Sequence, residues 1–101
     1  MEFSNVRVPA KANVFFDGKC VSHTVFLPDG SRKSVGVLLP STLRFDVSTP
    51  ERMEVVDGTA HVSIAGGSEQ AFGAGTSWTV DAGSYFVVRS EAPVHYVCHF
   101  G

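Results

Sequence analysis

The 101-residue sequence lacks long apolar runs and basic clusters, and it has only two cysteines. No apolar run approaches the ~20 residues of a membrane-spanning helix, so no membrane partner is predicted. A formal charge of −2 without clustered Lys or Arg argues against a nucleic-acid partner. The start of the chain lacks the basic-then-apolar order of a signal peptide. Because two cysteines make no disulfide framework, we predict Cys20 and Cys98 to be buried, reduced thiols in a cytoplasmic protein.

Helical periodicity is also missing, and Gly and Pro interrupt runs that are rich in Val, Phe and Thr. Short strands between turn signals indicate an all-β domain, and this length suits a single domain over residues 1–101. The predicted strands are Ala12–Phe16, Cys20–Phe26, Ser34–Leu39, Leu43–Val47, Met53–Val56, Thr59–Ile64, Gln70–Phe72, Ser77–Val80, Tyr85–Arg89 and Val94–Phe100. About ten short antiparallel strands in one small domain favour a β-barrel or jelly roll.

Turn residues predict how these strands connect. Asp17-Gly18 and Pro28–Ser31 predict tight turns in a meander, and Asp57-Gly58 predicts a type I′ hairpin in which the flanking strands pair. Apolar residues alternate with polar ones at Leu43, Phe45 and Val47, which places these three side chains on one face.

One spacing pattern in the sequence matches part of a metal-binding motif, but the histidine pair of that motif is absent. Glu51 followed after six residues by Gly58 resembles the second half of the first cupin motif, which normally follows a His-x-His pair. Phe45 and Val47 occupy the positions of that pair. The resemblance implies a cupin-type β-barrel (jelly roll).

The second cupin motif can be matched in the same way. Gly75 and Gly83 fit its glycines, Asp81 replaces its proline and Phe86 replaces its metal-binding histidine. A transition-metal site needs several imidazole, carboxylate or thiolate donors, and Glu51 alone does not supply them. We therefore predict no metal and no other cofactor.

Four long segments are similar to the small cupins of the pyrimidine/purine nucleoside phosphorylase family. They are Lys11–Val25, Pro28–Pro40, Pro50–Val55 and Tyr96–His99. The resemblance covers nearly the whole chain and departs from the family at Asp81 and in the 66–72 loop. It implies a homodimeric enzyme that cleaves purine and pyrimidine nucleosides with inorganic phosphate, giving free base and α-ribose 1-phosphate.

Phosphorolysis requires a cationic phosphate site and a group that assists the departing base. We predict that Arg32 binds the phosphate with Lys33 or Arg44, that Glu51 contacts the ribose or the base, and that His23 is a second polar contact. Burial near an apolar mouth would raise the pKa of Glu51.

An enzyme that accepts both classes of base needs a surface that stacks any base without reading its edges. The predicted base and ribose pocket consists of Phe45, Val47, Trp78 and Phe86. Two other functions stay open: a cupin that binds a sugar or nucleotide without catalysis, and a metal-dependent oxygenase or isomerase. The missing histidines argue against the second of these.

Overall fold

The computed structural model describes residues 1–101 as ten strands and one short 3₁₀ helix, so the all-β prediction is confirmed. The elements are β1 (Asn13–Phe15), η1 (Phe16–Gly18), β2 (Cys20–Phe26), β3 (Arg32–Leu38), β4 (Ser41–Asp46), β5 (Glu51–Asp57), β6 (Thr59–Ile64), β7 (Gln70–Gly73), β8 (Ser77–Val80), β9 (Tyr85–Ser90) and β10 (Val94–Phe100). No helix is long and apolar enough to traverse a bilayer.

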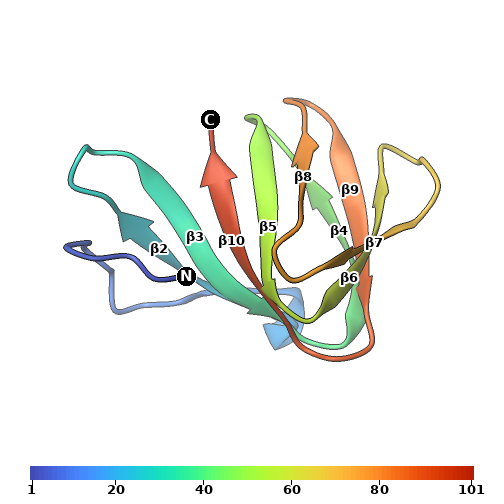
Figure 1. The fold of residues 1–101 in the computed structure, drawn as a ribbon, viewed down its shortest axis with the longest axis horizontal. Helices are drawn as coiled ribbons and strands as arrows, with labels where there is room; N and C mark the ends of the chain where they lie inside the picture. The colour runs from blue at the N-terminus through green and yellow to red at the C-terminus, as the bar shows by residue number, and fades with distance from the viewer.

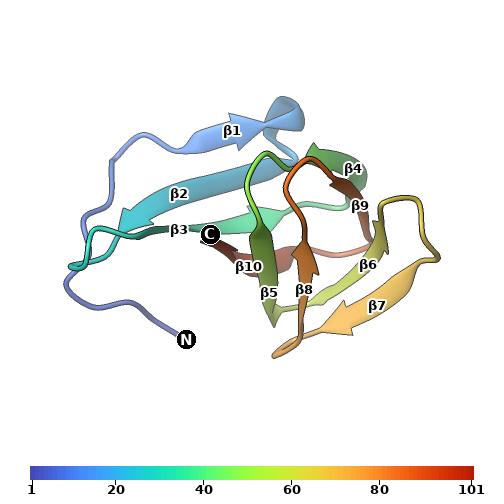
Figure 2. The same ribbon diagram turned by 90° about the horizontal axis from the view of Figure 1, so that it is seen from above.

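The strands form two sheets (Figures 1 and 2). The larger sheet has the order β1-β2-β3-β10-β5-β8, and the smaller sheet has the order β4-β9-β6-β7. Every strand pair is antiparallel and lies within one sheet. The two sheets therefore make a sandwich that is not closed by hydrogen bonds into a barrel.

The first three strands form the predicted meander. Strand β1 reaches β2 through Asp17 and Gly18, which both have positive φ, and β2 pairs with β3 across the turn at Gly30. These turns need left-handed backbone, which glycine adopts without steric cost.

The prediction of a hairpin at Asp57-Gly58 is wrong, because β5 and β6 do not pair. Strand β5 belongs to the larger sheet and β6 to the smaller one, so the chain crosses between sheets here. Gly58 has φ +92°, whereas Asp57 lacks the positive φ of a type I′ turn. A Cβ at Gly58 would lie 2.6 Å from the Pro93 carbonyl oxygen, so the crossing depends on glycine for space as well as for conformation.

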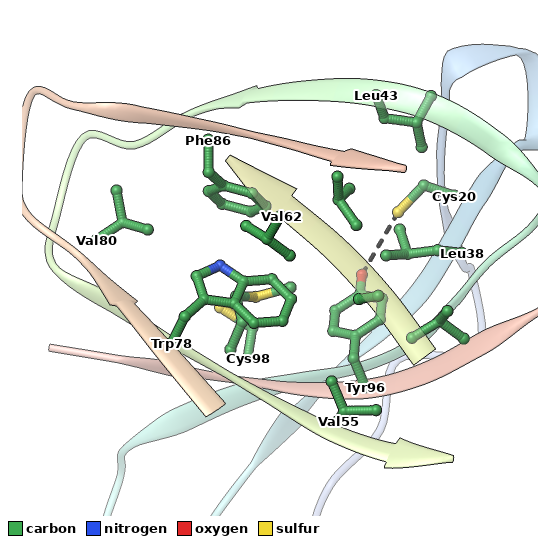
Figure 3. Close-up of a cluster of buried hydrophobic side chains, with 14 of the residues drawn as sticks. Cys20, Leu38, Leu43, Val55, Val62, Trp78, Val80, Phe86, Tyr96 and Cys98 are labelled. Atoms are coloured by element: carbon green, nitrogen blue, oxygen red, sulfur yellow. Dashed lines mark hydrogen bonds between the residues drawn. The ribbon is translucent and has the colours of Figure 1, made fainter. Parts of the chain in front are cut away.

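Apolar side chains from both sheets fill the space between them (Figure 3). Leu43 on β4 and Val47, just after β4, are buried, and Phe45 packs against the same core, as the alternation predicted. Cys20 and Cys98 are buried free thiols, which confirms their prediction. The core thus holds the inner faces together, while Val25 and Val97, which are buried outside this cluster, line a second apolar pocket with the N-terminal segment.

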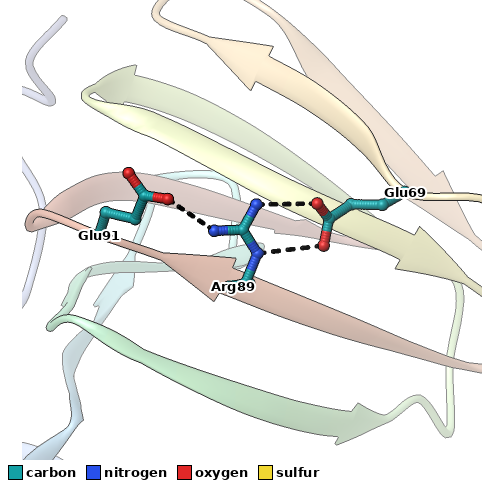
Figure 4. Close-up of polar contacts among 3 residues, drawn as sticks. All are labelled: Glu69, Arg89 and Glu91. Atoms are coloured by element: carbon teal, nitrogen blue, oxygen red, sulfur yellow. Dashed lines mark hydrogen bonds and ion pairs between the residues drawn. The ribbon is translucent and has the colours of Figure 1, made fainter.

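The outer face of the smaller sheet carries an exposed charge cluster (Figure 4). Arg89 on β9 pairs with Glu69 at 2.9 Å and with Glu91 at 2.8 Å. These hydrogen bonds hold the pKa of Arg89 above its ordinary value and the pKa of Glu69 below its own. Exposed ion pairs of this kind contribute little to stability because water and salt screen them.

Gly36 on β3 is needed because Tyr96 crosses over it. A Cβ at Gly36 would lie 2.7 Å from the Val21 carbonyl oxygen and 2.8 Å from the Tyr96 hydroxyl. We expect Gly36→Ala to lower the free energy of unfolding by roughly 1–3 kcal/mol through overpacking, measured by urea denaturation. Gly73→Ala is the control, because a Cβ there meets nothing within 4 Å. Equal stability of the two variants would contradict this account.

Candidate functional site

A cavity of about 290 Å³ opens between the two sheets. One side of it is apolar, and the other side carries hydroxyl, amide, thiol and charged groups. Its lining consists of Asn13, Phe15, Cys20, Ser22, Thr24, Arg32, Ser34, Phe45, Glu51, Met53, Phe86, Tyr96, Cys98 and Phe100. A cavity of this kind, apolar with a few convergent polar groups, is where a small ligand binds in most proteins.

Strand register brings the two charged residues of this cavity to one end of the larger sheet. Arg32 is the first residue of β3 and Glu51 is the first residue of β5. Strand β10 separates β3 from β5, and its last residue, Phe100, is the cross-strand partner of Glu51. Because alternate residues of a strand share a face, Arg32 and Ser34 both face the cavity.

Glu51 is partly buried and accepts a hydrogen bond from the thiol of a neighbouring strand. The Cys98 Sγ lies 3.5 Å from Glu51 Oε1. Burial raises the pKa of the Glu51 carboxyl, while the Cys98 hydrogen bond and the charge of Arg32 partly oppose this rise. Burial also raises the pKa of Cys98, so its thiol stays protonated as the donor. The carboxyl is therefore suited to hold and release a proton.

Arg32 lies at the exposed mouth of the cavity with its guanidinium over an aromatic ring. Its Cζ is 4.2 Å from the centroid of Phe100. Arg32 takes part in none of the ion pairs of the structure. A guanidinium placed over a ring keeps N–H groups available, and these match the oxygens of a phosphate or carboxylate.

Two stacked rings form the apolar side of the cavity. Phe45 on β4 and Phe86 on β9 are cross-strand partners whose centroids lie 5.1 Å apart with an interplanar angle of 14°. Phe16 from η1 meets Phe45 edge-on at 5.2 Å. Phe86 is fully buried, so it supports Phe45 from behind, and Phe45 presents the apolar surface on which a flat ligand can stack.

The chain has close full-length relatives. A family model described as pyrimidine/purine nucleoside phosphorylase matches residues 10–100. A protein of that name from Thiobacillus denitrificans is 55% identical to this chain and covers 98% of it, with 97% of its own length aligned. The chain belongs to the pyrimidine/purine nucleoside phosphorylase family.

Solved structures resemble the chain at two levels. A protein of unknown function from Acinetobacter sp. ADP1 is 41% identical, with a TM-score of 0.97 over 99% of this chain and 98% of that one. An RmlC-like cupin from Shewanella frigidimarina is 13% identical, with a TM-score of 0.71 over 98% of this chain and 86% of that one. At that identity the likeness concerns the fold alone, and it confirms the predicted cupin-type fold.

The metal-ligand positions of the cupin motifs carry apolar side chains in this member of the family. Phe45 and Phe86 stack on each other, and Val47 is buried in the core. No group of three or more His, Cys, Asp and Glu residues could hold a metal ion. The donor set around Glu51 therefore does not fit a transition metal, which needs several such ligands in one shell.

Three of the predicted polar site residues of this nucleoside phosphorylase family member lie outside the cavity. His23 is on the outer face of the larger sheet, with Nδ1 3.4 Å from the Pro9 carbonyl oxygen. The Lys33 Nζ is hydrogen-bonded at 2.7 Å to His99 Nδ1 on that same outer face. Arg44 pairs with Asp46 at 3.1 Å on the smaller sheet. The structure brings none of the three to Glu51, because each occupies a strand position facing away from the cavity.

Two predicted apolar residues lie behind the cavity wall. Val47 and Trp78 are buried in the core and do not line the cavity. Trp78 meets Phe86 edge-on, with centroids 5.7 Å apart (Figure 3), so it supports a ring that does line the cavity. Its indole Nε1 is buried without a hydrogen-bond partner. Of the predicted site, the structure thus brings together Arg32, Glu51, Phe45 and Phe86.

The sequence reasoning missed most of the polar lining. Asn13, Ser22, Thr24 and Ser34 face the cavity from β1, β2 and β3. Alternation along β2 and β3 was the available signal, because it places every second residue of each strand on the inner face. Alternation could not show which of the two faces of each strand lines the cavity.

Proposed function

We propose that this protein cleaves purine and pyrimidine nucleosides with inorganic phosphate, giving free base and ribose 1-phosphate without a metal ion. The observation that carries the proposal is one cavity in a chain of this family that holds an unpaired guanidinium, a carboxyl with a raised pKa and a stacked ring pair. Each of the three matches one requirement of the reaction.

Phosphate binding is assigned to Arg32. Its guanidinium supplies charge-assisted donors at the cavity mouth, and the hydroxyls of Thr24 and Ser34 line the same cavity. In the reaction a phosphate oxygen forms the new bond to C1′ of the ribose while the bond from C1′ to the base nitrogen breaks. Positive charge develops on the sugar, so an oriented anion beside it stabilises the transition state.

Glu51 is assigned to the proton that the departing base needs. The electron pair of the broken bond goes to the base nitrogen, and the protonated carboxyl of Glu51 donates its proton there. The proton of HPO₄²⁻ then restores the carboxyl, so the overall reaction leaves neutral base and ribose 1-phosphate dianion. A carboxyl whose pKa is raised by burial keeps such a proton to a higher pH than an exposed glutamate does.

Base tolerance follows from the stacked rings. Phe45, backed by the buried ring of Phe86, offers a π-face and no polar group that matches one base edge. Stacking is available to every base, whereas a site with matched donors and acceptors would reject bases that lack them. The broad acceptance of purines and pyrimidines is therefore part of the proposal.

One assay tests the proposal. Purified protein is incubated with inosine or uridine, with and without phosphate and with and without EDTA, and base release is followed by chromatography. We expect release that requires phosphate and does not change with EDTA. Release that stops with EDTA and returns with a divalent metal overturns metal independence. Nucleoside binding without release favours the non-catalytic binding cupin instead.

The oligomeric state and the cellular location belong to the same proposal. We infer a homodimer in the cytoplasm from the family resemblance and from the two buried thiols. Sedimentation equilibrium across a range of protein concentrations tests the dimer.

A further inference from the structure

Strand β1 turns through η1 and pairs with β2, and the first half of this hairpin, here called the β1–η1 hairpin, places large apolar side chains in solvent beside the cavity. Phe15 is 50% exposed and Phe16 is 43% exposed. Phe15 lines the cavity, and Phe16 packs on Phe45 of its stacked wall. Exposed aromatic residues gathered at the mouth of a cavity indicate a surface that a ligand covers.

The backbone of the hairpin turns both rings to the same side. In an extended strand, consecutive side chains point to opposite faces, so Phe15 and Phe16 would normally diverge. Phe16 has φ +54° and Asp17 has φ +53°, which is unusual for residues other than glycine. The left-handed turn therefore brings a second ring against Phe45, and strained backbone of this kind gathers at binding sites.

The other end of β1 supplies a polar group to the same cavity. The Asn13 Nδ2 lies 3.3 Å from Thr24 Oγ1 and 3.5 Å from Ser22 Oγ. With its amide nitrogen donating to these two hydroxyls, the Asn13 carbonyl oxygen is left as a free acceptor in the cavity. The hydroxyl groups of a sugar are donors of the kind that this oxygen accepts.

We propose that the β1–η1 hairpin is the nucleoside-recognition element of this protein, with Phe15 stacking on the base and Asn13 accepting a hydrogen bond from the pentose. The inference deepens the proposed function and rests on it. The base lies between Phe15 and Phe45, and the pentose lies along the polar side formed by β1, β2 and β3. Recognition thus comes from an edge strand that joins the rest of the sheet only through β2.

The test compares three neighbouring alanine variants, Asn13→Ala, Val14→Ala and Phe15→Ala, in steady-state phosphorolysis of uridine and inosine. We expect Phe15→Ala and Asn13→Ala each to raise the KM for both nucleosides roughly tenfold, with the KM for phosphate unchanged. Phe15→Ala weakens inhibition by free uracil and hypoxanthine, whereas Asn13→Ala weakens inhibition by ribose 1-phosphate and leaves free-base inhibition intact. Val14, 61% exposed and outside the cavity, is the matched control.

Other outcomes overturn the inference in distinguishable ways. If the wild-type protein releases base and all three variants match it, the hairpin assignment fails and the proposed function stands. If the wild-type protein releases no base, the proposed function and the hairpin assignment both fail. If Phe15→Ala changes the sedimentation coefficient but leaves the nucleoside KM unchanged, the exposed rings serve contact with a second copy of the chain, and the assignment is wrong.

Discussion

Arg32→Ala is expected to lower kcat/KM for phosphate roughly 100-fold, because it removes the only cationic group that lines the cavity. The variant should lose phosphate binding specifically, so the Kd of the nucleoside measured without phosphate should change little. Arg32→Lys should recover part of the activity, since it keeps the charge but not the two-pronged donor geometry. Initial rates at varied phosphate and fixed inosine measure the effect.

Lys33→Ala is the matched control for this experiment. Lys33 is adjacent in sequence and carries the same charge, but its side chain binds His99 on the opposite face of the sheet. If surface charge attracted phosphate in a general way, kcat/KM for phosphate would fall equally in both variants. If Lys33→Ala loses as much activity as Arg32→Ala, the assignment of phosphate to the cavity is wrong.

Glu51→Gln is expected to lower kcat by roughly 10²–10⁴-fold, because the amide cannot transfer a proton to the departing base. The loss of kcat should be largest for nucleosides with poor leaving groups. It should be smallest for p-nitrophenyl riboside, whose leaving group needs little proton assistance. Single-turnover rates on both kinds of substrate measure this difference. Equal losses on both would contradict a proton-donating role.

The melting temperature of Glu51→Gln distinguishes a loss of proton transfer from a loss of folded protein. The folded protein raises the pKa of Glu51 above its ordinary value of 4.5, so the native state keeps a proton that the unfolded chain has released. Stability contributed by this group therefore falls as the pH rises from 4.5 through the raised pKa. At a pH above that window the buried charge is unfavourable, so there Glu51→Gln should melt at the same temperature as wild type or higher. Glu54→Gln, on the outer face of the same strand, should keep wild-type kcat.

The sequence predicted the strands well because each depends on neighbours in the chain. Turn residues and period-two alternation are local, and they located ten strands, the meander and the inward set of Leu43, Phe45 and Val47. The Asp57-Gly58 hairpin failed because the same dipeptide can reverse a strand or pass it to another sheet. Which of these happens depends on the distant contact with Pro93.

The predicted site mixed residues from opposite faces. Arg32 and Lys33 are consecutive in β3, and Arg44 and Phe45 are consecutive in β4, so a strand cannot point both members of either pair into one cavity. Alternation alone would have required that choice. It could not say which member faces the cavity, and the structure selects Arg32 and Phe45.

Local pattern in the sequence was thus enough for the strand content, the shared face of Leu43, Phe45 and Val47, the family and the apolar residues at the cupin metal positions. Only the tertiary structure decided that Glu51 lies beside the Cys98 thiol and that Asn13 and Phe15 reach the cavity. Those neighbours come from strands far apart in the sequence. Their contacts depend on strand order and register across β3, β10 and β5, and cross-strand pairing is set by the whole sheet and not by any one segment.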